Sequence, residues 1–412
     1  MIYLLFLISL ALPSYLVRFK IFGVPTNVLE IIIYLSFFIQ IIILRKEIPK
    51  SLSIRNLKHL LKQSRLTPII LLFVAVFLSI LVAADKRMAL GIFKGWFLDP
   101  FLVFLMVQKN IKNQKDLLKI GLGLSLGVIL ISVWAVTQSL GFWYLLPHQE
   151  VEDFYGYILE KRAFGPFESP NYLGMYLAPA SIFLLGLGLF CLKEKAEKSQ
   201  EYLKIYRYFL LSSFIFSLVA LLLSKSSGAL LAFLAGLFFL LYHYLEKKAF
   251  FAKIIIFLIL LAVGFFLVTL NFAKTQTSFS IRKEIWQAAF SFIKSKPLLG
   301  VGLGGFPKVF DKYLWQHYPL LPSWAPWARM HPHNLFLAFW LNLGFLGFLS
   351  FLWLLYCFFK ELDFRAPLSF ILAGAMLSII LHGLLDTTYW KNDLSVLFWL
   401  ILSLAFKKLE ES

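Results

Sequence analysis

The sequence contains few charged residues and few cysteines for its length. Only 15% of its 412 residues are Asp, Glu, Lys or Arg, whereas 60% are hydrophobic. So little polar surface cannot cover a water-soluble domain of this size, which excludes a soluble enzyme. The two cysteines, Cys191 and Cys357, lack the CxxC spacing of a thiol metal site and do not indicate a disulfide framework.

Signature motifs of several enzyme classes are also missing. The chain has no Asp-x-Asp, HExxH or GxSxG motif, and no Walker-type glycine loop that ends in Lys-Ser or Lys-Thr. These absences argue against the familiar metal-dependent, zinc-protease, serine-hydrolase and NTPase sites.

Long apolar runs dominate the sequence instead. Each is about 17 to 20 residues long, enough to cross roughly 30 Å of hydrocarbon at 1.5 Å per residue. The pattern predicts an all-α polytopic membrane protein in which residues 1–412 form a single integral membrane domain. The twelve expected spans cover residues 1–17, 25–44, 68–84, 90–108, 118–139, 171–192, 208–224, 228–245, 254–271, 333–358, 367–384 and 392–406.

The basic residues predict the orientation of the chain. The formal net charge is +18, and most Lys and Arg residues near the expected spans fall in the loops on one side. Loops rich in Lys and Arg remain in the cytoplasm, so both termini are predicted to be cytoplasmic, in a multi-pass protein of the bacterial inner membrane. Such a charge suits contact with the anionic lipid of the bilayer. Because the basic residues are spread over short loops, nucleic acid is not an expected partner.

Two segments do not read as membrane spans and are expected on the outer face. They are a short outer loop, residues 140–170, and a long one, residues 272–332, which we expect to carry part of the active site. In the long loop Ser280 can cap a helix that runs to Ser295, before Pro297 stops it. Its apolar residues recur at spacings of three and four, which predicts an amphipathic helix lying on the membrane.

The segment His331-Pro332-His333-Asn334 stands where the tenth span begins. The positive end of a helix dipole disfavours a protonated imidazole, so we expect His333 to be neutral and able to accept a proton. A general base has this property. The structural alternative is a histidine that only caps the helix or lies at the interface.

Several cations are expected on the same face as this histidine: Arg162, Lys225, Arg282 and Arg329. Lys225 lies in a very short turn between two apolar runs, where a charge is costly unless it pairs or snorkels to the interface. Arg282 shares a face of the long-loop helix with Trp286, one turn away. Fixed cations beside helix starts can bind the oxygens of a diphosphate. With no metal signature, this combination suits a lipid-linked diphosphate donor.

In their order along the chain, these pieces resemble the bacterial O-antigen ligase and O-antigen polymerase superfamily. The matching pieces are the Gly-x-Phe-x-x-Pro-Asn core of the segment Arg162–Asn171, the turn Lys225-Ser226-Ser227-Gly228, the helix from Arg282 to Trp286 followed by Pro297 and Gly300-x-Gly302-x-Gly304, and the pair His333-Asn334. They extend over about the central half of the chain.

The resemblance implies a GT-C-like, inverting, metal-independent glycosyltransferase that needs no cofactor. Members take a glycan from an undecaprenyl-diphosphate carrier on the periplasmic side of the membrane. The acceptor is the lipid A core in ligases, another lipid-linked glycan in polymerases, or a protein hydroxyl in some relatives. The sequence leaves open whether this chain is a ligase or a polymerase.

Residue roles carry over from the same resemblance. His333 matches the histidine that activates the acceptor hydroxyl, and Arg282 matches an arginine that engages the diphosphate. Lys225 stands where many members have arginine in a Ser-Arg-Gly turn, and an ammonium group cannot make the same bidentate contact. The remaining candidates for substrate binding are Arg162, Arg329, Asn334 and Trp286.

Two other classes of protein are compatible with the sequence. A transporter or flippase of lipid-linked sugars would show internal repeats and polar residues within its spans. We find no repeat, but Asp99 falls inside the fourth span, and His382 and Asp386 lie near the end of the eleventh. The other class is a non-catalytic scaffold for envelope assembly, for which a large cationic outer loop could serve as a docking surface.

Overall fold

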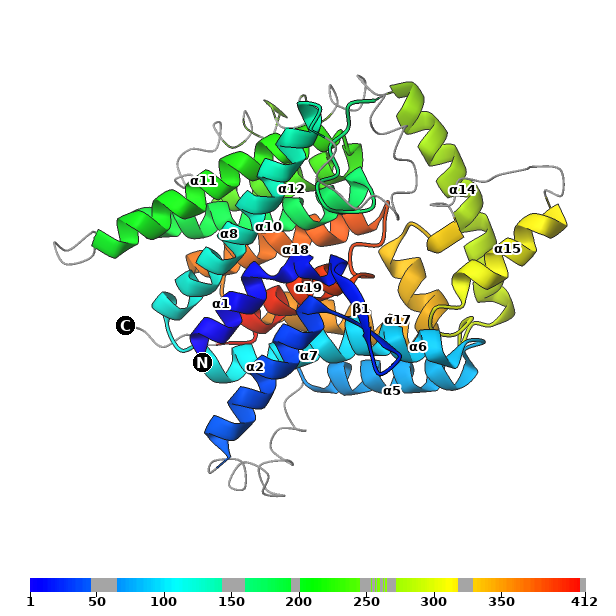
Figure 1. Ribbon diagram of the computed structural model, residues 1–412. Helices are drawn as coiled ribbons and strands as arrows, with labels where there is room; N and C mark the ends of the chain where they lie inside the picture. Colours follow the sequence, from blue (N-terminus) through cyan, green and yellow to red (C-terminus); the bar gives the residue numbers. More distant parts are fainter. Residues whose placement is uncertain are drawn as a thin grey trace.

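The structure is a computed structural model that describes residues 1–45, 65–142, 160–193, 201–244, single positions between 253 and 264, and residues 272–317 and 329–407. These parts are helical apart from turns and one small antiparallel hairpin (Figure 1). The elements are α1 (Ile2–Leu10), the 3₁₀ helix η1 (Leu12–Leu16), β1 (Arg18–Ile21), β2 (Val24–Asn27), α2 (Val28–Leu44), α5 (Thr67–Val82), α6 (Lys86–Phe93), the π-helical segment η2 (Lys94–Leu98), α7 (Asp99–Asn110), α8 (Gln114–Ser139), α10 (Pro170–Lys193), α11 (Glu201–Ser224), α12 (Ser227–Tyr244), α14 (Phe272–Ser295), α15 (Phe306–His317), α17 (Leu335–Glu361), α18 (Pro367–Gly383) and α19 (Asn392–Ala405).

The lengths of these helices agree with a polytopic helical membrane protein. Within the described ranges, five helical segments are long and apolar enough to cross a membrane, namely Lys86–Asn110, Gln114–Ser139, Pro170–Leu189, Lys204–Ser224 and Leu335–Glu361. Shorter apolar helices are Val28–Leu44, Thr67–Val82, Ser227–Tyr242, Pro367–Gly383 and Asn392–Ala405. The total of twelve spans and the GT-C likeness stay predictions, and the expected span 254–271 lies almost entirely outside the described residues.

The N-terminal region differs from the prediction. The expected span over residues 1–17 is not one helix, because α1 ends at Leu10 and a 3₁₀ helix that contains Pro13 follows. At 1.5 Å per residue, the nine residues of α1 reach only about 14 Å. The hairpin β1–β2 was not foreseen at all. Phe22 and Gly23 make its turn with φ angles of 48° and 78°, as two-residue hairpin turns of the I′ type require.

Side-chain contacts sort the helix ends into two groups. At one end of the bundle, Asn110 of α7 donates to Gln40 of α2 at 2.6 Å, and Arg65 before α5 donates to the Phe406 carbonyl after α19 at 2.8 Å. The starts of α10 and α17 meet the end of α18 at the opposite end, where Asn171 and His333 both contact Asp386. Successive turns therefore alternate between two ends, and one end collects the candidate residues.

Helix α14 differs from its predicted form in length and in what its apolar face contacts. It begins at Phe272, not at Ser280, and ends at Ser295 as expected. Its apolar face does not lie on a membrane surface but forms a second hydrophobic core with α15 and α17 (Ile285, Ala288, Ala289, Ile293, Phe306, Phe310, Leu314, Leu337 and Leu341). Figure 1 shows α14 and α15 together on one side of the bundle. This packing fixes α14 against the helix that follows His333.

A kink in α17 receives the loop that follows α14. Gly344 has φ 68° and ψ −171°, and the Phe345 amide donates to the carbonyls of Pro297 and Leu298, each at 3.1 Å. A Cβ atom at Gly344 would collide with the Leu298 carbonyl. Only glycine combines this left-handed conformation with such a close backbone approach. The kink thus sets the position of α14 relative to α17.

We predict that Gly344→Ala destabilises the protein more than Gly141→Ala. Both glycines have positive φ, but a Cβ at Gly141 would meet nothing within 4 Å. Gly141→Ala is therefore the control for the conformational cost of a side chain at positive φ, which is about 1 to 2 kcal/mol. The additional collision at Gly344 should lower the free energy of unfolding by at least about 3 kcal/mol. Thermal unfolding of the two purified variants measures the difference. Equal midpoints would show that the loop and the kink do not depend on each other.

Candidate active site

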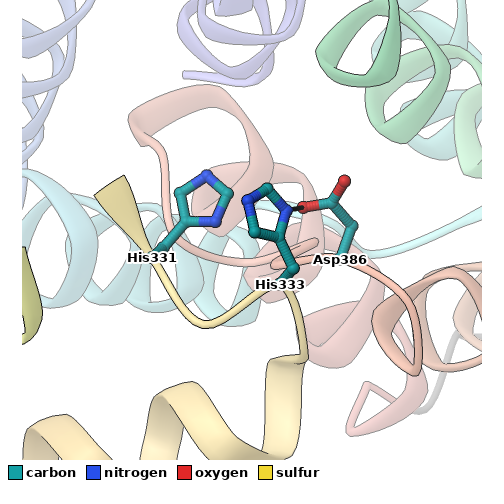
Figure 2. Close-up of side chains that lie close together, drawn as sticks. All are labelled: His331, His333 and Asp386. Atoms are coloured by element: carbon teal, nitrogen blue, oxygen red, sulfur yellow. Dashed lines mark hydrogen bonds and ion pairs between the residues drawn. The ribbon is translucent and has the colours of Figure 1, made fainter. Parts of the chain in front are cut away.

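The centre of the candidate site is a buried pair of His333 and Asp386 (Figure 2). Nδ1 of His333 lies 3.1 Å from Oδ1 of Asp386, and the two side chains are 4% and 2% exposed. His333 comes from the turn before α17, and Asp386 from the loop between α18 and α19. Oδ1 also accepts a hydrogen bond from the backbone amide of Thr387 at 2.9 Å. The loop thereby aims the carboxylate at the imidazole.

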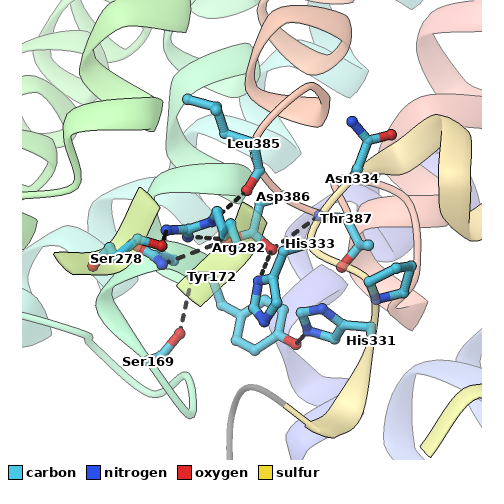
Figure 3. Close-up of polar contacts among 12 residues, drawn as sticks. Ser169, Tyr172, Ser278, Arg282, His331, His333, Asn334, Leu385, Asp386 and Thr387 are labelled. Atoms are coloured by element: carbon cyan, nitrogen blue, oxygen red, sulfur yellow. Dashed lines mark hydrogen bonds and ion pairs between the residues drawn. The ribbon is translucent and has the colours of Figure 1, made fainter. Parts of the chain in front are cut away.

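Arg282 reaches this carboxylate from α14. Its NH2 nitrogen is 3.5 Å from Oδ2 of Asp386, and its Nε donates to the Leu385 carbonyl at 2.8 Å (Figure 3). Its NH1 lies 3.4 Å from the carbonyl oxygen of Ser278. These contacts engage one N–H on each nitrogen, whereas a guanidinium carries five N–H donors. The Arg282 side chain is 14% exposed, so a charge at the edge of the site remains within reach of an anion.

Trp286 and Asn334 support the turn that carries His333. The φ angle of His333 is 44°, a left-handed conformation that is uncommon outside glycine and often marks a functional site. The indole Nε1 of Trp286 donates to the carbonyls of Pro332 and His333 at 3.1 and 3.3 Å. Asn334 caps α17 through Oδ1 and donates from Nδ2 to the Leu384 carbonyl at 2.9 Å. The predicted face shared by Arg282 and Trp286 is confirmed, because both side chains point at this turn and its partner loop.

The start of α10 forms another wall of the site. Ser169 caps this helix, since its hydroxyl accepts a hydrogen bond from the Tyr172 amide at 3.4 Å. Asn171 is 3.5 Å from Oδ2 of Asp386 and accepts a hydrogen bond from Ser226 at 3.0 Å. The Tyr172 hydroxyl lies 2.7 Å from Nε2 of His331. One helix start therefore contacts both the carboxylate and the second histidine of the site.

Opposing effects act on the ionisable groups of the site. Burial alone would raise the pKa of Asp386, but His333 and Arg282 beside it hold that pKa well below its usual range. Burial lowers the pKa of His331 from its ordinary 6.5 to about 3, and the neighbouring His333 acts in the same direction. Near neutral pH the site therefore contains an ionised carboxylate, a guanidinium and a neutral His331.

The other predicted cations do not join this centre. Lys225 has φ 50°, and its ammonium group is exposed and donates to the Glu160 carbonyl at 2.7 Å. Arg162 pairs with Glu160 at 3.8 Å and donates to the Ser224 carbonyl at the end of α11. Arg329 lies 3.7 Å from Asp311 of α15. The expectation that these cations converge with Arg282 and His333 is thus not met by their described contacts. Of the residues in the Lys225 turn, Ser226 is connected to the centre, because it bonds Asn171, which in turn contacts Asp386.

Four residues of the site were missed as site residues from the sequence. Asp386 drew attention only as a charge near a span, and that signal is the one that could have identified it. His331 was noted beside His333 without a role. Tyr172 and Lys391 had no signal, because their contacts join positions more than 150 residues apart.

His331, His333 and Asp386 also form the kind of group that can bind a metal ion. One nitrogen or oxygen atom from each lies within 4.8 Å of the others. However, Nδ1 of His333 already pairs with Asp386, and the Arg282 guanidinium occupies the other side of the carboxylate. A cation would have to displace or repel that guanidinium. The residues suit a hydrogen-bonded ion pair better than a divalent metal ion.

The fold and this site define a helical membrane protein with a buried histidine–carboxylate–arginine centre at one end of its bundle. Residues 212–352 match a family model described as O-antigen ligase. A protein of Rickettsia typhi, whose name proposes that it is a polysaccharide ligase, is 29% identical over 214 residues. That match covers 47% of this chain and 49% of the relative, so the chain spans about half the length of the curated relative. Both findings support the O-antigen ligase superfamily for this chain.

We predict that His331 makes the stability of the protein depend on pH. Its pKa is about 3 in the folded chain and 6.5 without the fold, so between these values the unfolded chain binds one more proton. Above pH 6.5 His331 is neutral in both the folded and the unfolded chain, so its protonation does not reduce the free energy of unfolding. As the pH falls below 6.5, the unfolded chain takes up this proton first, and the free energy of unfolding decreases. The slope is at most about 1.4 kcal/mol per pH unit.

Unfolding midpoints of the wild type and of His331→Asn, measured between pH 7.5 and 5, test this dependence. The difference in stability between the two proteins should change with pH in favour of the variant at low pH. Parallel pH profiles would show that His331 is already able to take up a proton in the folded protein.

Proposed function

We propose that this protein is an O-antigen ligase-type glycosyltransferase that moves a glycan from an undecaprenyl-diphosphate carrier to an acceptor hydroxyl. The reaction takes place on the outer face of the bacterial cytoplasmic membrane, with both termini in the cytoplasm. The family match supports the class of reaction, and the His333–Asp386 pair supports the chemistry. The acceptor is a glycan, the lipid A core or a protein. The protein needs no cofactor and no metal ion.

His333 is the general base in this proposal. An ionised carboxylate only accepts hydrogen bonds, so the hydrogen of a neutral His333 sits on Nδ1, facing Asp386. Nε2 then carries the lone pair that takes the proton from the acceptor hydroxyl. When the imidazolium forms, Asp386 stabilises it and holds its orientation, as the carboxylate does in a serine-protease triad. This buried pair is the observation that carries the proposal.

The transfer is a single displacement with inversion at the anomeric carbon. The acceptor oxygen forms a bond to that carbon while the bond to the diphosphate oxygen breaks, and the leaving diphosphate keeps the bonding electron pair. The acceptor proton moves to His333. Because no metal ion is required, cationic side chains offset the charge that develops on the diphosphate.

Arg282 is the closest cation to the base among the described residues, and it binds the departing diphosphate with the N–H donors that no described residue engages. Lys225 and Arg162 lie at the Ser226 turn, outside the His333 centre, and are assigned to binding of the donor. Arg329 attracts the substrate from a more exposed position. Trp286 and Asn334 act through the backbone of the His333 turn, which they hold in place.

We predict that His333→Ala and Arg282→Ala each abolish glycan transfer without preventing membrane insertion. The assay uses purified protein, an undecaprenyl-diphosphate-linked oligosaccharide and lipid A core, in the presence of EDTA. His317→Ala and Arg365→Ala are matched controls, since both side chains are exposed and bond only locally. Transferred product identifies an enzyme, whereas mere relocation of the lipid-linked glycan would identify a flippase. Wild-type activity that disappears with EDTA would contradict the metal-independent mechanism.

We further predict that Asp386→Asn lowers the rate of transfer by about 10²- to 10⁴-fold, because the neutral amide neither fixes the tautomer of His333 nor stabilises its imidazolium. Affinity for the donor should change far less. The control is Asp363→Asn, which removes an exposed carboxylate that pairs with Arg365. If Asp386→Asn kept a rate within threefold of the wild type, His333 would not depend on this carboxylate.

A further inference from the structure

The hairpin β1–β2 exposes a continuous group of apolar side chains. Phe22 in its turn is fully exposed, and Phe19, Ile21 and Val24 are between 38% and 56% exposed. Phe22 also has a φ angle of 48°, a conformation that is costly for an aromatic residue and that two-residue hairpin turns usually give to Asn or Gly. Neighbouring exposed apolar residues of this kind mark a contact with a partner outside the chain.

The strand register separates these apolar residues from basic ones. Successive side chains of a strand point to opposite faces of the sheet. Phe19 and Ile21 therefore share one face of β1, and Ile21 pairs across the hairpin with Val24. Arg18 and Lys20 lie on the other face. The hairpin is thus amphipathic, with an apolar face, an aromatic tip and a basic face.

An ion-pair network connects the basic face to the candidate site. Arg18 pairs with Oε1 of Glu168 at 3.0 Å, just before α10 begins. Oε2 of the same carboxylate bonds Lys391, whose ammonium group lies 3.6 Å from the centroid of the Tyr172 ring. The hairpin therefore lies at the end of the bundle that carries the candidate site.

Contacts with the segment after α5 fix the backbone of the hairpin. Arg87 donates to the Gly23 carbonyl at 3.0 Å, and Lys94 donates to the Pro25 carbonyl at 2.6 Å. Figure 1 shows the hairpin next to α6. The apolar helix α5 leads there from the opposite end of the bundle, where Arg65 precedes it. Because α5 ends and α10 begins beside the hairpin, it lies at the level where the hydrocarbon of a bilayer gives way to headgroups.

We propose that the hairpin β1–β2 is a membrane-contact element that lies in the headgroup region of the leaflet on the side of the candidate site. Its apolar face and Phe22 insert at the boundary between headgroups and acyl chains, and Lys20 on the basic face contacts lipid phosphates. Interfacial amphipathic helices divide their faces in the same way, and basic residues at the surface are attracted to anionic lipid. The inference does not depend on the transfer reaction.

A lipid surface fits this hairpin better than a second copy of the chain does. In a two-fold symmetric dimer the same patch would face itself. The exposed cations Lys20, Lys86 and Arg87 around the apolar residues would then approach their own copies and repel one another. Lipid phosphates carry the opposite charge, and acyl chains accept the apolar tip.

Spin labels on the hairpin test the inference in nanodiscs of phosphatidylethanolamine and phosphatidylglycerol. The native cysteines are first removed by Cys191→Ser and Cys357→Ser. Single labels are then attached through Lys20→Cys on the basic face, Ile21→Cys on the apolar face and Phe22→Cys at the tip, all of them exposed positions. Collisions with oxygen, which concentrates in hydrocarbon, and with a nickel chelate, which stays in water, report the surroundings of each label.

The labels at Ile21 and Phe22 should lose contact with the nickel chelate and keep frequent collisions with oxygen. A control label at Leu130, which is 66% exposed on the long apolar helix α8, should behave in the same way. The label at Lys20 should stay accessible to the nickel chelate, as should one at the exposed Lys161. The expected result is thus an alternation between neighbouring positions of β1.

Three other patterns would overturn the proposal. Nickel access at Ile21 and Phe22 would show that the hairpin projects into water. Protection of these two labels from both reagents would indicate a protein partner, such as a second copy of the chain. Protection of Lys20 from the nickel chelate together with the other two positions would show that the basic face does not point to the headgroups.

Discussion

A single carboxylate, that of Asp386, holds the candidate site together. It is almost fully buried, and it is matched by His333 on one oxygen and by Arg282 on the other. A buried charge is tolerated only when it is paired and hydrogen-bonded, so the elements that carry these residues must meet. The start of α17, the middle of α14 and the loop after α18 converge on this one charge. Removal of Asp386 or of Arg282 would leave the other of the two charges without its ion-pair partner.

The alternation of helix ends explains why the site can form. Within the described residues, each long apolar helix leads the chain from one end of the bundle to the other, so the residues at every second turn share an end. The start of α10 brings Asn171 and Tyr172 to the same place by this rule. The kink at Gly344 then fixes α14 beside α17, because the loop after α14 packs into it. Packing of the helices brings the site residues close together, and these specific contacts fix their distances and orientations.

Some of the site followed from local patterns. His333 and Asn334 stand at a helix start that the sequence marks with a proline, a capping residue and a long apolar run, and the structure has a cap there. Arg282 and Trp286 follow from helical spacing alone. Lys225 and Arg162 are also cations beside helix ends, as the sequence predicts. Their side chains, however, contact Glu160, and Arg162 also bonds the end of α11. A side chain's direction depends on the nearest available partner, which a local pattern does not contain.

The sequence by itself determined the class of protein, the placement of most helices and the histidine at the start of α17, because hydropathy, helix period and capping act over short stretches of chain. Only the tertiary structure decided that Asp386 is the partner of His333, that Arg282 neutralises it, and that Tyr172 and Lys391 stand behind His331. These contacts join residues 50 or more positions apart. Their energy comes from desolvation and pairing of charges within one buried volume, and that volume does not exist until the helices have packed.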